Sequence, residues 1–356
     1  MKNFFQDKIV AEDISNISIA LLKIAKALEG KTMLITGGSG FLGSYMVGTI
    51  LSLNKIILKE PCKIISVDNY ITSSKKSKKK IPFLTNIDHD ISRPLHIKEP
   101  VDYIIHAAGI ASPIYYKQYP LEAIDVAVNG TRNILELAHR RAPKSILYFS
   151  SSEIYGDPTA DQIPIKETYR GNVSSIGPRA CYDESKRLGE TLCMTYFDLY
   201  KIPVKIVRPF NIYGPGMKMN DYRIMPNLIS KYLQKKKNLP IFGKGTQTRA
   251  FCYISDAIEG FFRVLLSKKH GEIYNVGNDE REITMRDLAK LMNKLFENKL
   301  KIKKTTYPND YPKDEPRRRS PDITKIKNNL GYRPKIALKK GLMRTITWCK
   351  DNWSVV

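Results

Sequence analysis

Short apolar runs alternate with helical segments in the first half of the chain. The runs 33–35, 62–67, 101–109 and 144–156 read as buried strands, and 131–140 repeats its apolar positions at helical spacing. Strands that alternate with helices predict right-handed β-α-β units, which build a parallel sheet covered on both faces. We therefore expect an α/β fold with a doubly wound parallel sheet.

The segment before the first strand, residues 1–30, has the pattern of an amphipathic helix that ends at Gly30. Its apolar positions recur at helical spacing: Ile14, Ile17, Leu21, Ile24 and Leu28. Lysines interrupt the apolar stretch, no small-residue cleavage site follows it, and it is too short to cross a bilayer. We expect a helical extension that packs on the body of the protein or on a partner subunit, with no membrane insertion.

The second half of the chain mixes short strands with helices and proline-rich connections. The clearest loop runs over 307–322, and neither a repeat nor an independent linker separates this half from the first. We expect three parts: the extension at 1–30, a first domain at 31–205 and a smaller α/β domain at 206–356. The smaller domain should fold against the first, with some chain crossing between them, and close a cleft.

The formal net charge is +24, which could indicate nucleic acid, a membrane surface or anionic substrates. The lysines are spread over the whole chain without a nucleic-acid-binding motif, so we favour anionic substrates and expect no nucleic-acid partner. The run from Lys75 to Lys80 is interpreted as a solvated loop. The five cysteines are scattered and lack metal-ligand spacing, which predicts a cytoplasmic protein without a structural metal.

Residues 31–51 combine a strand, a glycine turn and the start of a helix. Gly37, Gly40 and Gly43 have the spacing of a dinucleotide-binding fingerprint, which needs a tight turn, backbone open to a pyrophosphate, and close packing of helix on strand. The next strand ends at Asp68, where a carboxylate would accept hydrogen bonds from the adenosine ribose and repel a 2′-phosphate. These features predict a Rossmann-type sheet that binds NAD in preference to NADP.

Further polar residues should meet at the sheet edge where such folds bind ligands. Ala107, Ser151 and Glu153 follow the ends of predicted strands and should converge there. Tyr182 and Lys186 are four residues apart on a predicted helix and face the same way, which by itself is usually just a helix surface. Joined to the glycine turn, they are interpreted as the proton-transfer pair of a dehydrogenase, in which the ammonium and a nicotinamide cation stabilise the phenolate.

Several motifs resemble those of extended short-chain dehydrogenases/reductases that act on nucleotide sugars. The general marks are GGSGFLG, HAAG, the tyrosine and lysine pair, RPFNIYGP and NNLGYRPK. A narrower resemblance is to UDP-glucuronate decarboxylases, to which HDISRPL, SSSEIYGDP, GPRACYDESKR, MKMNDYRI and TQTRAFCYISD are similar nearly word for word. The resemblance implies a Rossmann-type NAD-binding sheet and a smaller C-terminal α/β substrate domain.

The resemblance also implies a reaction. Tyr182 would take a proton from the sugar 4-hydroxyl while a hydride passes to NAD, and the hydride would later return. The 4-ketone is beta to the C6 carboxylate, so carbon dioxide leaves and UDP-glucuronate becomes UDP-xylose. Ser151 would bond the oxygen at C4, and Glu153 would act near C5 as an acid/base or orienting group. A homodimer through the helices near Thr131 and Tyr182 is implied as well.

The family pattern assigns ligand-binding residues too. The set for NAD is Gly37, Gly40, Phe41, Leu42, Gly43, Asp68, Asn69, Asp90, Ile91, Ala107, Ala108, Tyr182 and Lys186. The set for the nucleotide-diphosphate sugar, a UDP-sugar, is Tyr116, Asn211, Arg223, Arg249 and Arg319. Guanidinium groups suit a diphosphate because they are planar, charged and bidentate.

Two other functions stay open. A nucleotide-sugar 4-epimerase or 4,6-dehydratase shares the 4-keto step, and Asp125 stands where the decarboxylases carry a substrate-binding lysine. Dehydratases use an adjacent Asp-Glu pair, of which the first member is here Ser152, and epimerases usually lack the glutamate at position 153. The other alternative is a non-catalytic protein that senses NAD, which the complete set of catalytic residues disfavours.

Overall fold

The computed structural model describes residues 4–73, 80–219, 221, 223–307 and 316–353. Two segments discussed in the sequence analysis lie partly or mostly outside these ranges. The lysine run, apart from Lys80, and the middle of the proline-rich loop, 308–315, lie outside the described residues.

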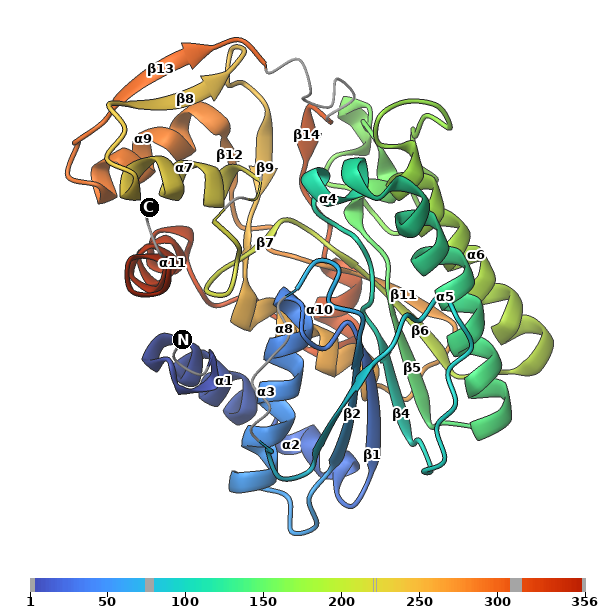
Figure 1. Ribbon diagram of the computed structural model, residues 1–356. Coiled ribbons are helices and arrows are strands. Elements are labelled where there is room, and N and C mark those ends of the chain that lie inside the picture. Colours follow the sequence, from blue (N-terminus) through green and yellow to red (C-terminus); the bar gives the residue numbers. More distant parts are fainter. Residues whose placement is uncertain (1–3, 74–79, 220, 222, 308–315, 354–356) are drawn as a thin grey trace.

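A parallel sheet forms the centre of the protein (Figure 1). Seven strands of the described chain pair in the order β3-β2-β1-β4-β5-β6-β11, and every pairing is parallel. Their bounds are β1 Thr32–Thr36, β2 Lys63–Asp68, β3 Leu84–Asp88, β4 Tyr103–His106, β5 Ser145–Phe149, β6 Val204–Pro209 and β11 Glu272–Val276. The order reverses between β1 and β4, where such sheets bind ligands beyond the carboxyl ends of their strands. The predicted doubly wound fold is confirmed, and β11 brings the second half of the chain back into this sheet.

Helices cover both faces of the sheet. One face carries α1 Lys8–Ala20, α3 Phe41–Ile56 and α8 Ile254–Leu265, and the other carries α5 Pro120–Arg141 and α6 Ala180–Tyr200, with the short α4 Pro113–Gln118 before α5. Successive residues of a strand point to opposite faces. Met33 and Ile35 of β1 accordingly pack in the first layer and Leu34 in the second. Because both faces are covered, the central strands β1, β4 and β5 are buried along their whole length, whereas the edge strand β3 is partly exposed.

A smaller region lies beyond the carboxyl ends of the strands, at the upper left of Figure 1. Its described part contains small sheets that pair β7 with β10, β9 with β12 and β14, and β8 with β13. The strands are β7 Ile212–Tyr213, β8 Asn238–Phe242, β9 Thr248–Ala250, β10 Cys252–Tyr253, β12 Glu282–Thr284, β13 Lys301–Thr305 and β14 Arg318–Arg319. The accompanying helices are α7 Ile224–Leu233, α9 Met285–Leu295 and α11 Leu338–Asn352, whereas α10 Thr324–Leu330 packs beside β11 of the central sheet.

The N-terminal extension packs on the body of the protein, and it is divided where the sequence predicts one helix. Its pieces are η1 Phe4–Gln6, α1, α2 Leu22–Ala25 and η2 Lys26–Leu28. The N–H of Leu21 bonds both Ile17 O and Ser18 O, so the chain tightens toward a 3₁₀ turn at the end of α1. The predicted apolar stripe is buried nonetheless, with Ile24 half-buried. Among the described helices, these included, none is long and apolar enough to cross a membrane.

Buried polar groups join α1 to the last helix, α11. Arg344 donates to Asp13 Oδ1 at 2.8 Å and to Ile9 O at 3.0 Å, and the Tyr253 hydroxyl donates to Asp13 Oδ2 at 2.7 Å. Burial raises the pKa of Asp13 to about 6, although Tyr253 and Arg344 both act to lower it. Because these contacts join α1 to α11, both chain ends lie on the same side of the molecule (Figure 1).

Candidate active site

A cavity of about 1100 Å³ opens at the carboxyl ends of the strands. Every residue that the sequence assigned to catalysis, cofactor or substrate contributes to its wall. These are Gly37, Gly40, Phe41, Leu42, Gly43, Asp68, Asn69, Asp90, Ile91, Ala107, Ala108, Tyr116, Ser151, Glu153, Tyr182, Lys186, Asn211, Arg223, Arg249 and Arg319. The fold thus gathers residues from nearly the whole chain around one space.

The glycine turn between β1 and α3 shapes one end of the cavity. Gly37 has φ of +72°, and a Cβ there would lie 2.8 Å from Ala107 O. A Cβ on Gly43 would lie 2.1 Å from Gly37 O, so α3 can approach the turn only without a side chain. A Cβ on Gly40, the N-cap of α3, would meet one described atom, Gly37 O at 3.3 Å. The start of α3 is therefore unobstructed by side chains at Gly40, and its first N–H groups have no partner within the helix. Such a helix start fits the pyrophosphate of a dinucleotide.

Asp68, at the end of β2, ties the glycine turn to the next loop. Its Oδ2 accepts from Ser39 N at 2.9 Å, and its Oδ1 accepts from Tyr70 N at 2.9 Å and Ser73 Oγ at 3.1 Å. The carboxylate is thereby held at the cavity wall. Its place beside the turn fits the adenosine ribose that the sequence assigned to it.

Tyr182 and Lys186 lie one turn apart on the buried side of α6. The Tyr182 ring stacks on Tyr116, with 5.5 Å between ring centroids and 13° between planes. The Lys186 ammonium donates to Phe149 O, at the end of β5, at 2.7 Å. Both side chains are less than one-tenth exposed, so α6 presents them to the cavity from within the protein.

Burial dominates the ionisation of this pair. It raises the pKa of Tyr182 to about 12, while a hydrogen bond with Ser151 acts to lower it. Burial also lowers the pKa of Lys186 to about 8. The protein groups alone therefore do not bring Tyr182 toward neutral pH. A bound cation such as an oxidised nicotinamide would have to supply the remaining shift.

Glu153 sits between two arginines. Arg319 donates to both of its oxygens, at 2.5 and 2.6 Å, and Arg179 bonds Oε2 from the other side. Burial by itself would raise the pKa of Glu153, but Arg179, Arg319 and Arg249 together hold it below its usual value. Arg179 also bonds Asp183 at 3.3 Å, and burial together with the charge of Glu153 raises the pKa of Asp183 to about 7. In this state Arg319 binds a carboxylate and not a diphosphate.

The other residues assigned to the nucleotide sugar are also engaged. Arg223 donates twice to Asp221 Oδ2, at 2.8 and 2.6 Å. Arg249 donates to the backbone carbonyls of Thr248 and Pro316, at 2.8 and 2.7 Å. Asn211, with φ of +44°, donates to Ala250 O at 2.9 Å. Each guanidinium is thus oriented at the wall before any ligand arrives.

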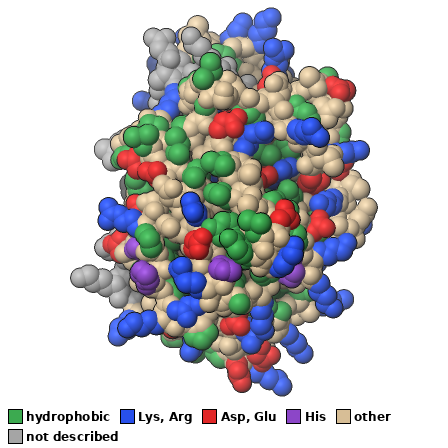
Figure 2. Space-filling view, turned by 90° about the vertical axis from the view of Figure 1, so that its right-hand side faces the viewer, with side chains coloured by type: hydrophobic (Ala, Val, Ile, Leu, Met, Phe, Trp, Pro, Cys, Tyr) green, Lys and Arg blue, Asp and Glu red, His purple; other side chains and the backbone are tan. Residues whose placement is uncertain are grey.

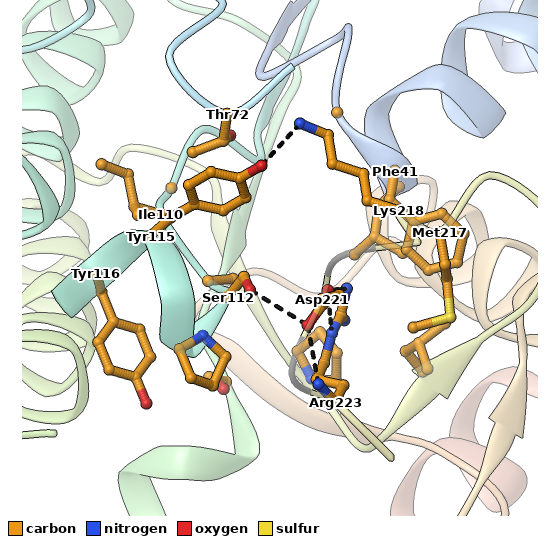
Figure 3. A pocket seen from close by; sticks show the side chains of 18 of the residues that line it. Phe41, Thr72, Ile110, Ser112, Tyr115, Tyr116, Met217, Lys218, Asp221 and Arg223 are labelled. Atoms are coloured by element: carbon orange, nitrogen blue, oxygen red, sulfur yellow. Dashed lines mark hydrogen bonds and ion pairs between the residues drawn. The ribbon is translucent and has the colours of Figure 1, made fainter. Parts of the chain in front are cut away.

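Sequence reasoning assigned no role to the residues that join the cavity walls. In Figure 3, Ser112 donates to Asp221 at 3.2 Å and Lys218 donates to the Tyr115 hydroxyl at 3.1 Å, so two contacts connect the start of α4 with the loop after β7. Phe4, from the extension, also lines the cavity. Arg179, Lys218 and Asp221 stand inside motifs that carry the family resemblance, and that is the signal that could have identified them.

Comparison with protein-family models matches residues 33–277 to the NAD dependent epimerase/dehydratase family. Among curated proteins, UDP-glucuronic acid decarboxylase 6 of Arabidopsis thaliana is 42% identical over 313 residues, which cover 87% of this chain and 86% of that protein. UDP-glucuronic acid decarboxylase 1 of Danio rerio is 37% identical over 330 residues, covering 92% and 74% respectively.

Solved structures show the same architecture. The epimerase Mth375 of Methanothermobacter thermautotrophicus has a TM-score of 0.80 and 26% identity, over 94% of this chain and 96% of that one. UDP-glucuronic acid 4-epimerase of Bacillus cereus, solved with UDP-glucuronic acid and NAD, has a TM-score of 0.75 and 25% identity, over 90% of this chain and 100% of that one.

Proposed function

Because the chain belongs to the NAD-dependent epimerase/dehydratase family, we propose that it decarboxylates UDP-glucuronate to UDP-xylose through a 4-keto intermediate. The observation that carries this proposal is the similarity to UDP-glucuronic acid decarboxylases at 37–42% identity over most of the chain. The cavity supports it, because the proposed catalytic residues Ser151, Glu153, Tyr182 and Lys186 all line it.

NAD is the cofactor, and when bound it accepts a hydride from C4 of the sugar and later returns it. Tyr182 is the proposed base for the 4-hydroxyl proton, with Ser151 beside it to hold the same oxygen. Lys186 supports the phenolate by its charge. Once C4 is a ketone, the C6 carboxylate is beta to it. The bond between C5 and C6 can then break, with its electrons entering the carbonyl as carbon dioxide leaves. A proton from solvent added at C5 and the hydride returned to C4 would complete UDP-xylose.

Glu153 is the proposed group near C5. Its two arginine partners keep it ionised, so it is better suited to orient a group or accept a proton than to donate one. Arg223, Arg249 and Arg319 are the proposed partners of the diphosphate, and residues 206–356 are the proposed substrate domain. For Arg319 this role requires a rearrangement, because the guanidinium must share or leave Glu153.

The test is product identification by mass spectrometry from a panel of nucleotide sugars. UDP-glucuronate should be consumed with release of carbon dioxide and formation of UDP-xylose, without net accumulation of NADH. Tyr182→Phe should lose about 10² to 10⁴ in rate because the base is removed. Its matched control is Tyr232→Phe on α7, a residue outside the cavity wall.

The second candidate is a 4-epimerase, and Asp125 favours it. This carboxylate lines the cavity, is exposed, and accepts from Asn129 at 3.1 Å. It would repel a uronate more than a neutral hexose. Epimerisation or dehydration of a neutral UDP-hexose, with UDP-glucuronate untouched, would refute the decarboxylase assignment and leave the 4-keto chemistry standing. Absence of turnover on every sugar would favour a protein that only senses NAD.

We also propose a homodimer through α5 and α6, which lie side by side and pack on each other. Figure 2 shows hydrophobic side chains gathered in the middle of this face. The exposed ones on the two helices are Leu121, Ile124, Leu188, Leu199 and Tyr200. Light scattering should give a dimer that Leu199→Asp dissociates and Leu22→Asp, on exposed α2, does not. A monomeric wild type would contradict this.

The unpaired cysteines support a cytoplasmic location.

A further inference from the structure

Two lysine-rich segments that are far apart in the sequence lie side by side in the smaller region. Strands β8 and β13 pair in parallel at the upper left of Figure 1, with Lys301 beside Asn238 and Lys303 beside Pro240. Six exposed lysines on this pair of strands and just before β8 form what we call the lysine ribbon: Lys235, Lys236, Lys237, Lys301, Lys303 and Lys304.

Little negative charge balances the lysine ribbon. The sequence has no Asp or Glu at 222–255 or at 298–307. Glu297, next to the second of these stretches, pairs with Lys299 at 2.7 Å, and Lys299 is not part of the ribbon. Among the residues that the structure describes, the nearby carboxylates therefore leave the charge of the ribbon uncompensated.

The guanidinium groups of the cavity differ from the ribbon in this respect. Arg179, Arg223 and Arg319 each form an ion pair with a carboxylate, so their charges are largely compensated at a distance. A nucleotide sugar carries negative charge on both phosphates, and a uronate carries a further charge at C6. Such a ligand gains long-range attraction from uncompensated lysines more than from these arginines.

The lysine ribbon adjoins the cavity wall. Pro240 and Phe242 of β8 line the cavity, as does Tyr307, which follows β13 and packs on Phe242 with 5.6 Å between ring centroids. Side chains alternate between the two faces of a strand, so the paired residues Lys303 and Pro240 share one face. Lys303 is four residues before Tyr307, which is about 13 Å along an extended strand.

We propose that the lysine ribbon attracts the anionic nucleotide sugar to the cavity through its long-range field, without binding it directly. The inference rests on the nucleotide-sugar substrate of the proposed function. The Debye length is about 30 Å at about 10 mM ionic strength and about 3 Å at about 1 M, so the separation of about 13 Å falls between the two. The attraction therefore operates in dilute salt and is screened in concentrated salt.

The test is calorimetric titration of the NAD-loaded protein with UDP in dilute and in concentrated salt. The combined variant Lys301→Gln, Lys303→Gln and Lys304→Gln should bind UDP about 10-fold more weakly at about 10 mM salt, the lower end of the range for electrostatic focusing. At about 1 M salt its affinity should lie within about twofold of the wild type. UMP has one phosphate fewer, so its affinity should decrease less than that of UDP.

A matched control removes the same charge from the other end of the sheet. Lys23→Gln, Lys26→Gln and Lys144→Gln are exposed positions before the starts of β1 and β5, whereas the cavity lies at the carboxyl ends of the strands. Their combination should change UDP affinity by less than about twofold at about 10 mM salt.

Three results would overturn the inference. One is unchanged UDP affinity of the ribbon variant in dilute salt, and another is an equal loss in the control, which would indicate an effect of total charge. The third is a loss that persists in concentrated salt, because the lysines would then contact the nucleotide. If the wild type binds UDP but does not turn over UDP-glucuronate, the proposed function fails, and the UDP titrations still decide the role of the ribbon.

Discussion

Replacing Lys186 by methionine should separate the contribution of this lysine to the turnover rate from its effect on the free energy of unfolding. The side chain is 4% exposed, and its ammonium donates to a neutral acceptor, Phe149 O, at 2.7 Å. Burial lowers its pKa from 10.5 to about 8. Methionine has a similar length and no charge, so the substitution removes the buried cation with little change in volume.

The size and sign of the effect follow from this pKa. A shift of about 2.5 units corresponds to about 3 kcal/mol of unfolding free energy, a penalty fully present below pH 8. Between pH 8 and 10.5 the unfolded chain binds more protons than the folded one at this site, so the wild type gains stability as pH rises. Relative to Lys186→Met, it should gain about 1.4 kcal/mol per pH unit in this window.

The assay is urea denaturation of both NAD-free proteins between pH 7 and 9.5. Lys205, whose pKa burial also lowers to about 8, is present in both proteins and cancels in the difference. The difference in unfolding free energy should be constant up to pH 8 and then change by about 2 kcal/mol in favour of the wild type. A difference that stays flat to pH 9.5 would refute the argument that burial destabilises this ammonium. Turnover by Lys186→Met should fall by about 10² to 10⁴.

Three further substitutions test the cavity wall. Gly43→Ala places a Cβ 2.1 Å from a backbone carbonyl of the glycine turn, so a thermal melt should show a lower transition and no upward shift on adding NAD. Asp68→Ala removes the carboxylate that accepts hydrogen bonds from three groups of the glycine turn and the next loop. Titration should show NAD bound at least about 10-fold more weakly, because hydrogen bonds to a charged group contribute about 1.5–3 kcal/mol. Glu153→Gln leaves Arg179 and Arg319 without the carboxylate that they share, so denaturation should show a decrease of about 3–5 kcal/mol in the free energy of unfolding. The absorbance of enzyme-bound NADH should also persist during turnover.

The sequence was informative wherever a signal is local. The apolar runs predicted β1, β2, β4 and β5, although not the edge strands β3 and β11. The glycine spacing with Asp68 predicted one end of the cavity, because a strand, a turn and a helix start are set by neighbouring residues. The spacing of Tyr182 and Lys186 likewise predicted a shared helix face. These features needed no knowledge of the rest of the chain.

Partners brought together by the fold could not be predicted in the same way. Glu153 and Arg319 are 166 residues apart, and no periodicity relates a strand edge to β14, which spans two residues. The pattern that assigned Arg319 to a diphosphate could not show that a carboxylate already binds it. The raised pKa of Tyr182 is also a property of burial, which depends on the whole cavity and not on its lysine neighbour alone.

The junction of α1 with α11 has a consequence for how the protein is made. Asp13 and Arg344 are 331 residues apart, so α1 is synthesised long before α11, and in the meantime its buried carboxylate lacks its arginine partner. The apolar side of α1 packs on α3 and α8, so part of it also stays uncovered until α8 has been made. A nascent chain with this apolar surface exposed is prone to aggregation until the later helices dock.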